Sequence, residues 1–141
     1  MTSPPDRSHW LTRRCFTLGV FVLALSIASA PGHAAELSAA SRAEIDALLD
    51  RLGQSGCEFN RNGSWYDAPK AKAHLARKLD YLLDKKLVAS TEQFIELAGS
   101  KSSRSGKTYS VRCRGEEPVP SATWLTTELQ KIRTKSVEEQ R

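Results

Sequence analysis

The hydrophobic positions of this chain follow two different periods, and the changes between them divide it into helices and strands. The first apolar stripe falls at helical spacing and consists of Ile45, Leu48, Leu49 and Leu52. Ser38 is a suitable N-cap in front of this stripe, and Gly53 is a suitable residue to end it. The opposite face is charged, so the pattern predicts a helix with one buried and one solvent-facing side.

A second helical stripe begins near Asp67 and runs to about Lys86. Pro69 is tolerated in a first helical turn, and Asp67 can accept hydrogen bonds from the free amides there. The apolar positions are Ala71, Leu75, Leu79 and Leu82, with Tyr81 and Leu83 widening the stripe. His74 and Lys78 are four residues apart on one edge of it, so they are predicted to be neighbours on one face.

Two further helical patterns are found later in the chain. Ser90 and Gln93 have the spacing of a capping box in front of a short apolar run that Gly99 ends. Ser121 or Thr123 can cap a last helix. Its apolar positions are Ala122, Leu125, Leu129 and Ile132.

The strand patterns are one hairpin and one later segment. Residues 57–66 read Cys-Glu-Phe-Asn-Arg-Asn-Gly-Ser-Trp-Tyr, and Asn62-Gly63 supplies the two residues that tolerate positive φ in a type I′ turn. Residues 107–114 alternate between apolar and polar, which predicts a half-buried strand, and residues 116–120 are not expected to continue it. The expected fold class is α+β, with about four helices packed on a small antiparallel sheet made from the hairpin and the C-terminal strand.

The N-terminal residues 1–34 follow neither period. Basic residues precede an uncharged apolar run from Cys15 to Ala28, and small residues follow it, which is the order found in secretory signal peptides. Cleavage is expected after Ala34, with Ala30 and Ala35 as alternatives. The run is shorter than the roughly 20 residues that span a bilayer, so no membrane span is expected after cleavage.

The chain is therefore predicted to be exported to the periplasm as a single domain, residues 35–141, whose tail frays from about residue 134. Residues 12–16 resemble the twin-arginine export signal, but the general secretory route suits the apolar run as well, so the route stays open. Removal of the signal leaves 18 basic and 15 acidic residues, a net charge of +3. This mild charge argues against a nucleic acid as partner.

Cys57 and Cys113 are the two cysteines of the predicted mature chain. In an oxidising compartment, a disulfide between them is favoured over two free thiols or a metal site. His74 is the only histidine after residue 34, and one histidine cannot complete a zinc site of the Cys/His type. We therefore expect one disulfide, no metal and no cofactor.

Catalytic motifs are not found at the spacing that their chemistry requires. The segment from Gly99 to Thr108 ends in Gly-Lys-Thr, but six residues separate its two glycines and it leads from a helix to a strand. A Walker loop has four residues between its glycines and leads from a strand to a helix, so nucleotide hydrolysis is not expected. A small hydrolase that uses His74 is the lesser alternative, and we expect no catalytic residues.

The same loop is the candidate binding site, because hydroxyls, backbone amides and cationic groups can converge on an anion there. The hairpin turn is expected beside it, since a disulfide places the two strands next to each other. The candidate binding residues are Arg61, Asn62, Ser102, Ser103, Arg104, Ser105, Gly106, Lys107 and Tyr109. The expected partner is an unknown protein or an acidic ligand of the cell envelope, and the alternative is a solvated turn without a ligand.

Four ordered motifs carry a family resemblance. They are Cys-x-Phe-x-Arg-Asn-Gly-x-Trp-Tyr at 57–66, His-Leu-x-x-Lys at 74–78, Thr-Glu-Gln-Phe-Ile at 91–95, and Ser-Ser-x-Ser-Gly-x-x-Tyr-x-Val-x-Cys at 102–113. Together they resemble the YfeK-like family of small exported bacterial proteins, over nearly all of the mature chain. The resemblance implies a periplasmic single domain whose biochemical role is unassigned, and it carries over no catalytic residue.

Residues 105–109, Ser-Gly-Lys-Thr-Tyr, are also similar to the Ser-Gly-x-x-Tyr loop of periplasmic lysozyme inhibitors. In those proteins the loop enters the lysozyme cleft, where a serine hydroxyl and backbone amides can donate to two carboxylates. Those inhibitors are mostly β-structure, unlike the fold expected here. The prediction is therefore a periplasmic binding protein without its own catalysis, and a lysozyme-inhibitor-like protein is the alternative.

Overall fold

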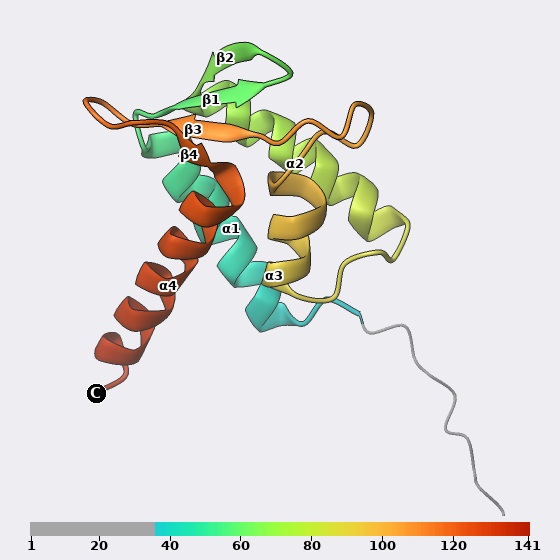
Figure 1. Ribbon diagram of the computed structural model, residues 1–141. Coiled ribbons are helices and arrows are strands. Elements are labelled where there is room, and N and C mark those ends of the chain that lie inside the picture. Colours follow the sequence, from blue (N-terminus) through green and yellow to red (C-terminus); the bar gives the residue numbers. More distant parts are fainter. Residues whose placement is uncertain (1–35) are drawn as a thin grey trace, which may run out of the picture. The chain divides into compact units, whose positions relative to one another are not determined.

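The computed structural model describes residues 36–141, which form helices and one small antiparallel sheet (Figure 1). The predicted signal peptide, residues 1–34, lies outside the described residues. The α+β fold class, with four helices and one disulfide, is confirmed. No helix within residues 36–141 combines the length and the hydrophobicity that crossing a membrane requires.

The first two helices bury the apolar stripes predicted for them, except that Tyr81, expected to widen the second stripe, is exposed. α1 (Ala39–Gln54) begins after Ser38, whose Oγ accepts a hydrogen bond from the Ser41 amide at 3.1 Å. α2 (Ala68–Asp84) begins after Asp67, whose carboxylate accepts from the Lys70 amide at 2.9 Å. The core contains Ile45, Leu48, Leu49 and Leu52 from α1 and Ala71, Leu75, Leu79 and Leu82 from α2.

Gly53 lies inside α1 instead of ending it, so the sequence-based prediction is wrong at this residue. The helix ends at Gln54, and the left-handed residue that follows is Gly56, with a φ of +66°. A Cβ on Gly53 would lie 2.7 Å from the Cδ atom of Lys72 on α2. Gly53 therefore allows α1 and α2 to approach closely.

The third helical segment changes type along its length. α3 (Thr91–Phe94) is a short α-helix, and η1 (Ile95–Gly99) is a π-helix that continues it. Ser90 Oγ accepts from the Gln93 amide at 3.2 Å, and the Gln93 side chain accepts from a nearby backbone amide at 2.8 Å, which completes the cap. Gly99 is the last residue of η1, and a Cβ there would collide with a leucine of the last helix.

Four antiparallel strands form the sheet in the order β2-β1-β3-β4. They are β1 (Glu58–Arg61), β2 (Ser64–Asp67), β3 (Ser110–Arg112) and β4 (Val119–Pro120), and they lie above the helices in Figure 1. β1 and β2 are the predicted hairpin, while β3 is shorter than the strand predicted for residues 107–114. The connector does not continue β3, as predicted, but β4 within it pairs with β3 and was not predicted. The proline is tolerated because β4 is an edge strand.

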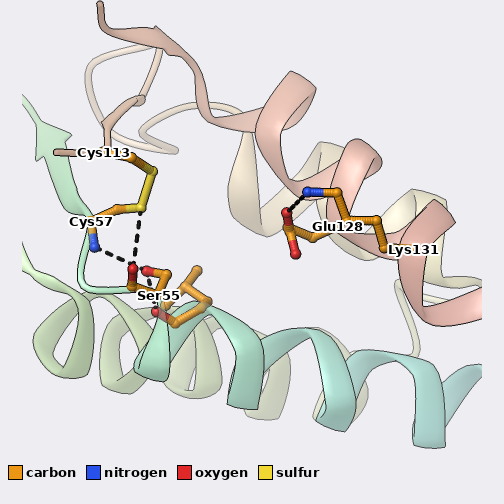
Figure 2. The surroundings of a disulfide bond; sticks show 6 residues. Ser55, Cys57, Cys113, Glu128 and Lys131 are labelled. Carbon is orange, nitrogen blue, oxygen red and sulfur yellow. Dashed lines mark hydrogen bonds and ion pairs between the residues drawn. A yellow bond between two sulfur atoms is a disulfide. The ribbon is translucent and has the colours of Figure 1, made fainter. Parts of the chain in front are cut away.

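Cys57 and Cys113 form the predicted disulfide, with their Cα atoms 4.2 Å apart (Figure 2). They flank the pairing of β1 with β3, in which Phe59 faces Val111. The Cys57 amide donates to Ser55 Oγ at 3.2 Å, which fixes the short connection from α1 to β1. The disulfide therefore ties the hairpin to the C-terminal strand.

The last helix, α4 (Ser121–Glu139), begins without a side-chain cap. Pro120 occupies the N-cap position, so neither Ser121 nor Thr123 caps the helix as predicted. Ser121 is buried, and its amide donates to the Tyr109 carbonyl at 3.0 Å. A backbone carbonyl next to β3 thus satisfies this first amide, which sequence spacing cannot reveal.

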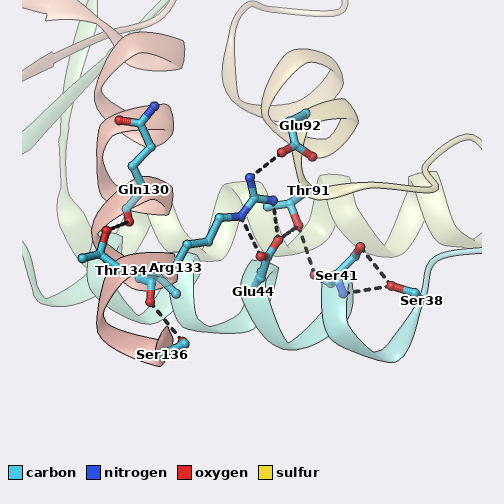
Figure 3. Close-up of polar contacts among 10 residues, drawn as sticks. Ser38, Ser41, Glu44, Thr91, Glu92, Gln130, Arg133, Thr134 and Ser136 are labelled. Carbon is cyan, nitrogen blue, oxygen red and sulfur yellow. Dashed lines mark hydrogen bonds and ion pairs between the residues drawn. The ribbon is translucent and has the colours of Figure 1, made fainter. Parts of the chain in front are cut away.

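An ion-pair cluster holds α4 against α1 and α3 (Figure 3). Arg133 Nε donates to Glu44 Oε1 at 2.7 Å, and Arg133 Nη1 donates to Glu92 Oε1 at 2.8 Å. Glu44 also accepts from the Thr91 hydroxyl at 2.6 Å. These hydrogen bonds, that of Arg133 first, lower the pKa of Glu44. The cluster lies beside residue 134, where fraying was predicted to begin, and the structure continues the helix beyond it.

A second cluster on α4 centres on the buried Glu128, close to the disulfide (Figure 2). Glu128 accepts from Arg51 of α1 at 2.6 Å and from Lys131 at 2.7 Å. Burial opposes ionisation of this carboxyl, but the two cationic donors prevail and lower its pKa. The same residues line a hollow of about 680 Å³ between α1, α4 and the disulfide. Both clusters on α4 therefore match each cation with a carboxylate.

Candidate functional site

The hairpin turn and the loop that follows η1 are joined at their tips. Asn62 and Gly63 have φ values of 55° and 91°, as the predicted two-residue turn requires. Ser105 Oγ donates to Asn62 Oδ1 at 2.6 Å. The structure therefore brings together the two halves of the site that the sequence predicted.

The loop itself is folded back and held by its own backbone. The Ser102 amide donates to the Lys107 carbonyl, and the Gly106 amide donates to the Ser102 carbonyl, both at 2.9 Å. Ser102 is buried, and its Oγ accepts from the Ser105 amide at 3.3 Å. Gly106 has a φ of +71°, which closes the turn. Ser102 and Gly106 thus shape the loop and do not present a side chain to solvent.

Ser103, Arg104 and Lys107 form the exposed side of the loop. Tyr109 differs from them, because only 6% of its surface is exposed. Its ring forms part of a pocket wall beside the loop. The predicted residues therefore divide into an exposed tip, a structural part and a pocket wall.

A pocket of about 240 Å³ lies between α2, the hairpin and Tyr109. Core side chains form an apolar floor, and the small residues Ala71 and Ala73 of α2 leave space above it. Aromatic and basic side chains form the remaining walls. The lining residues are Phe59, Asn60, Arg61, Tyr66, Lys70, Ala71, Ala73, His74, Leu75, Arg77, Tyr109 and Ser121.

The charges around this pocket have one sign. Arg61, Lys70 and Arg77 line it, and no aspartate or glutamate does so. Lys70 has a partner outside the lining, Asp67, at 3.3 Å. For Arg61 and Arg77, no carboxylate in the described part of the chain lies within ion-pair distance. The pocket therefore presents cations that the fold leaves unmatched.

Arg61 is held over the ring of Tyr66, with its guanidinium carbon 4.7 Å from the ring centroid. Such a cation–π contact orients the guanidinium and leaves N–H donors available to a ligand. Hydrogen bonding and charge from Arg61 also lower the pKa of the Tyr66 hydroxyl. The two residues flank the hairpin turn, so the hairpin itself positions this donor.

His74 lines the pocket, is half-buried and stays neutral at pH 7. Its Nε2 and the Tyr109 hydroxyl share a hydrogen bond of 3.4 Å. Burial, followed by the charges of Arg61, Lys78 and Arg77, lowers the pKa of His74 from 6.5 to about 4. A neutral imidazole has one donor and one acceptor nitrogen, so it can bind a hydroxyl group.

Lys78 lies one turn after His74 on α2, as their spacing of four residues predicted. Its Nζ donates to the carbonyls of Ala98, at 2.8 Å, and of Lys101, at 3.2 Å. It also lies 5.4 Å from the centroid of the Tyr109 ring. Burial and the charge of Arg61 lower the pKa of Lys78. Its hydrogen bonds make Lys78 an anchor between α2, the end of η1 and the loop.

Tyr66, Lys70 and Arg77 are not among the site residues predicted from the sequence. Two signals point to them once the pocket is known. Lys70, His74 and Arg77 follow each other at spacings of four and three along α2, which places them on one face. Tyr66 pairs with Phe59 across the hairpin, so its ring lies on the inner face of the sheet.

Comparison with protein families gives the identity of the chain at the level of a family. Residues 39–133 match the model of a family of unknown function (DUF5329). The chain belongs to this family, which agrees with the unassigned role that the motifs implied. No curated protein and no solved structure shows a significant match. Within residues 36–141, no three His, Cys, Asp or Glu side chains are placed to hold a metal ion.

Proposed function

We propose that this protein is a periplasmic binding protein, without catalysis of its own, that binds an acidic ligand or partner on its basic face. The basic face comprises the pocket, the hairpin tip at Asn62 and the exposed loop residues Ser103, Arg104 and Lys107. The observation that carries the proposal is the pocket lining, in which cations from α2 and the hairpin gather without a carboxylate. Unmatched cations repel one another, and an anionic ligand removes that cost.

The periplasmic location is supported by the order of charge and hydrophobicity in residues 1–34 and by the disulfide. The same location fits the resemblance to the YfeK-like family, which we propose as the narrower relationship of this chain. Cell fractionation tests the location. A shortened, oxidised protein in the periplasmic fraction is expected, and a full-length protein in the cytosol would contradict it.

The absence of catalysis is supported by the surroundings of His74. A serine hydrolase needs a histidine that accepts a proton from its nucleophile and is oriented by a carboxylate. The neighbours of His74 are the Tyr109 hydroxyl and three cationic side chains, and these cations disfavour the protonated imidazole that such a mechanism passes through.

A lysozyme-inhibitor-like activity is the second candidate function. It is favoured by the loop, which presents Ser103 and Arg104 to solvent while internal hydrogen bonds fix its backbone. A fixed basic loop suits an acidic enzyme cleft, because less entropy is lost on binding. Inhibition of a lysozyme in a cell-wall clearing assay tests this candidate, and full lysozyme activity at saturating protein would exclude it.

The main proposal is tested with polygalacturonate as an acidic probe and dextran as a neutral one. Immobilised protein should retain polygalacturonate, and the retained amount should fall as salt is added, because the attraction is electrostatic. Dextran should not be retained. Equal retention of both polymers, or retention that salt does not change, would contradict the proposal.

The loop is tested by the triple variant Ser103→Ala, Ser105→Ala and Arg104→Glu. We expect it to bind polygalacturonate several-fold more weakly, because a cation is replaced by an anion at the tip. Lys135→Glu is the matched control. It makes the same change of charge at an exposed position of α4 and should change retention little.

A further inference from the structure

The size of the pocket limits what can enter it. Its volume of about 240 Å³ exceeds the roughly 150 Å³ of a cavity that holds benzene, and it falls below the roughly 300 Å³ at which sites for drug-sized molecules begin. The pocket therefore has room for one six-membered ring and one substituent. A larger molecule can place only one such unit inside.

The walls suit the flat face of a ring. Phe59 and Leu75 give the floor an apolar surface, and the ring of Tyr109 stands at one side. Ala71 and Ala73 line the α2 side of the pocket, where larger side chains would occupy the space. Apolar and aromatic surfaces of this kind cover the C–H face of a sugar or the face of an aromatic ring.

The unmatched cations place the acidic substituent. Lys70 and Arg77 are seven residues apart on α2, which corresponds to about 10 Å along the helix. Lys70 already has Asp67 as a partner, whereas Arg61 and Arg77 both line the pocket near enough to His74 for their charges to lower its pKa, so these two arginines have the greater attraction for an anion. A guanidinium can bind two oxygens of a carboxylate or phosphate at once.

Neutral polar groups line the pocket as well. His74 and Tyr109 can each donate and accept a hydrogen bond, and Asn60 also lines the pocket. A ring that carries hydroxyls can satisfy these groups, whereas an unsubstituted aromatic ring would leave them unpaired on binding. This distinguishes a sugar ring from an aromatic one.

Building on the proposed function, we propose that the pocket binds one pyranose unit that carries a carboxylate or phosphate group. The acidic group lies at Arg61 and Arg77, the ring lies on the floor beside Tyr109, and the hydroxyls face His74. The unit is either a free sugar acid or one residue of an acidic polysaccharide, since both present the same chemistry.

Calorimetric titration with four small probes tests the proposal. Glucuronate and glucose 6-phosphate carry the ring, the hydroxyls and the charge, while glucose lacks the charge and benzoate lacks the hydroxyls. We expect at least one of the two sugar acids to bind at least tenfold more tightly than glucose and than benzoate. Glucose binding as tightly as both sugar acids would overturn the role of the charge. Benzoate binding as tightly as both would overturn the choice of a sugar.

Two variants locate the binding in the pocket. Arg77→Gln should weaken binding of the sugar acid at least fivefold, and Ala73→Leu should weaken it similarly by filling the space without changing any charge. Arg42→Gln is the matched control, because Arg42 pairs with Asp46 on α1 and does not line the pocket. This variant should bind the sugar acid with unchanged affinity. Unchanged affinity in both pocket variants would overturn the proposal, and a fold check by circular dichroism accompanies each variant.

The outcome separates this inference from the proposed function. If polygalacturonate binds and responds to the loop variant but no small sugar acid binds, the pocket inference falls and the basic face remains. If an acidic sugar binds and is excluded by Ala73→Leu while the loop variant has no effect, the pocket inference stands and the loop is removed from the site. If neither probe binds, both fall.

Discussion

Two charged regions of this protein use their arginines in opposite ways. Where α4 crosses α1 and α3, Arg133 is shared by Glu44 and Glu92, so charge is matched at the contact (Figure 3). At the pocket, no carboxylate is among the residues that line it together with Arg61 and Arg77. Matched charges hold helices together, whereas unmatched cations work against folding unless something outside the chain binds them.

The two regions also shift pKa values in ways that report this difference. Near Arg133, hydrogen bonds and charge lower the pKa of Glu44 and Glu92, which favours their ionised forms. Near the pocket, burial and neighbouring cations lower the pKa of His74, which favours its neutral form. One region therefore stabilises the charge that it holds, and the other resists an additional positive charge.

The largest expected effect comes from removing the disulfide. Cys57→Ser with Cys113→Ser should lower the free energy of unfolding by about 4 kcal/mol, because the bond restricts the unfolded chain. Urea denaturation measures this. A loss below about 1 kcal/mol would mean that packing alone holds β1 against β3.

The next effect comes from one substitution made in both regions. Arg133→Gln should lower the free energy of unfolding by about 1–2 kcal/mol, a modest figure because the 45% exposure of the side chain screens its ion pairs. Arg77→Gln should leave stability unchanged or raise it slightly, since it removes an unmatched cation. Thermal and urea unfolding of the pair measure the contrast. Equal losses in both variants would break the comparison.

The regions should also respond to different ranges of pH. The unfolded chain protonates His74 near pH 6.5 and the folded chain only at about pH 4, so acidification between these values favours unfolding. After allowance for solvent screening this amounts to about 1 kcal/mol. His74→Gln should remove the loss in this range, which pH-dependent urea denaturation measures.

The carboxylates around Arg133 act in a lower range. Their pKa values lie below 4.5 in the folded state, so the stability that they contribute is present above about pH 4.5 and is lost as the pH falls further. Arg133→Gln should reduce only this second loss. A variant in either region that changed both ranges equally would show that they are not independent.

The smallest effect concerns the contact between loop and hairpin. Ser105→Ala removes the exposed hydrogen bond to Asn62 and a weak one, at 3.4 Å, that Ser105 Oγ accepts from the Lys107 amide, so stability should fall by about 0.5 kcal/mol. Hydrogen exchange at the Gly106 amide, which donates to the Ser102 carbonyl and not to Ser105, should become faster. Unchanged exchange would mean that the backbone bonds of the loop fix it without help from the hairpin.

Local chemistry explains where sequence reasoning succeeded. The stripe of α1, the Asp67 cap and the Asn62-Gly63 turn each depend on residues next to one another, and each was predicted. Gly53 was misread because a glycine that ends a helix and a glycine that lets another helix approach look alike in sequence. The cap of α4 was misread because its partner is a carbonyl of Tyr109, distant along the chain.

The candidate site was predicted in part for a similar reason. The loop and the hairpin tip were placed together through the disulfide, a long-range link that cysteine counting reveals. The pocket was missed because its residues come from α2, both hairpin strands and Tyr109, and no motif joins them. The space in the pocket also depends on the small side chains of Ala71 and Ala73. Small residues on a helix do not by themselves predict a cavity.

The position of β1 inside the sheet has a consequence for how the chain reaches this structure. β1 lies between β2, which follows it at once, and β3, which ends just before Cys113, 56 residues after Cys57. A hairpin closes within microseconds, but a contact this far along the chain must first overcome the entropy of closing the intervening loop. We therefore expect the hairpin to form first, with Phe59 uncovered until the segment containing Tyr109 and Ser121 folds onto it. The pocket is therefore among the last parts of the fold to form, because its lining extends from Phe59 to Ser121. A ligand can bind there only after these distant segments have packed together.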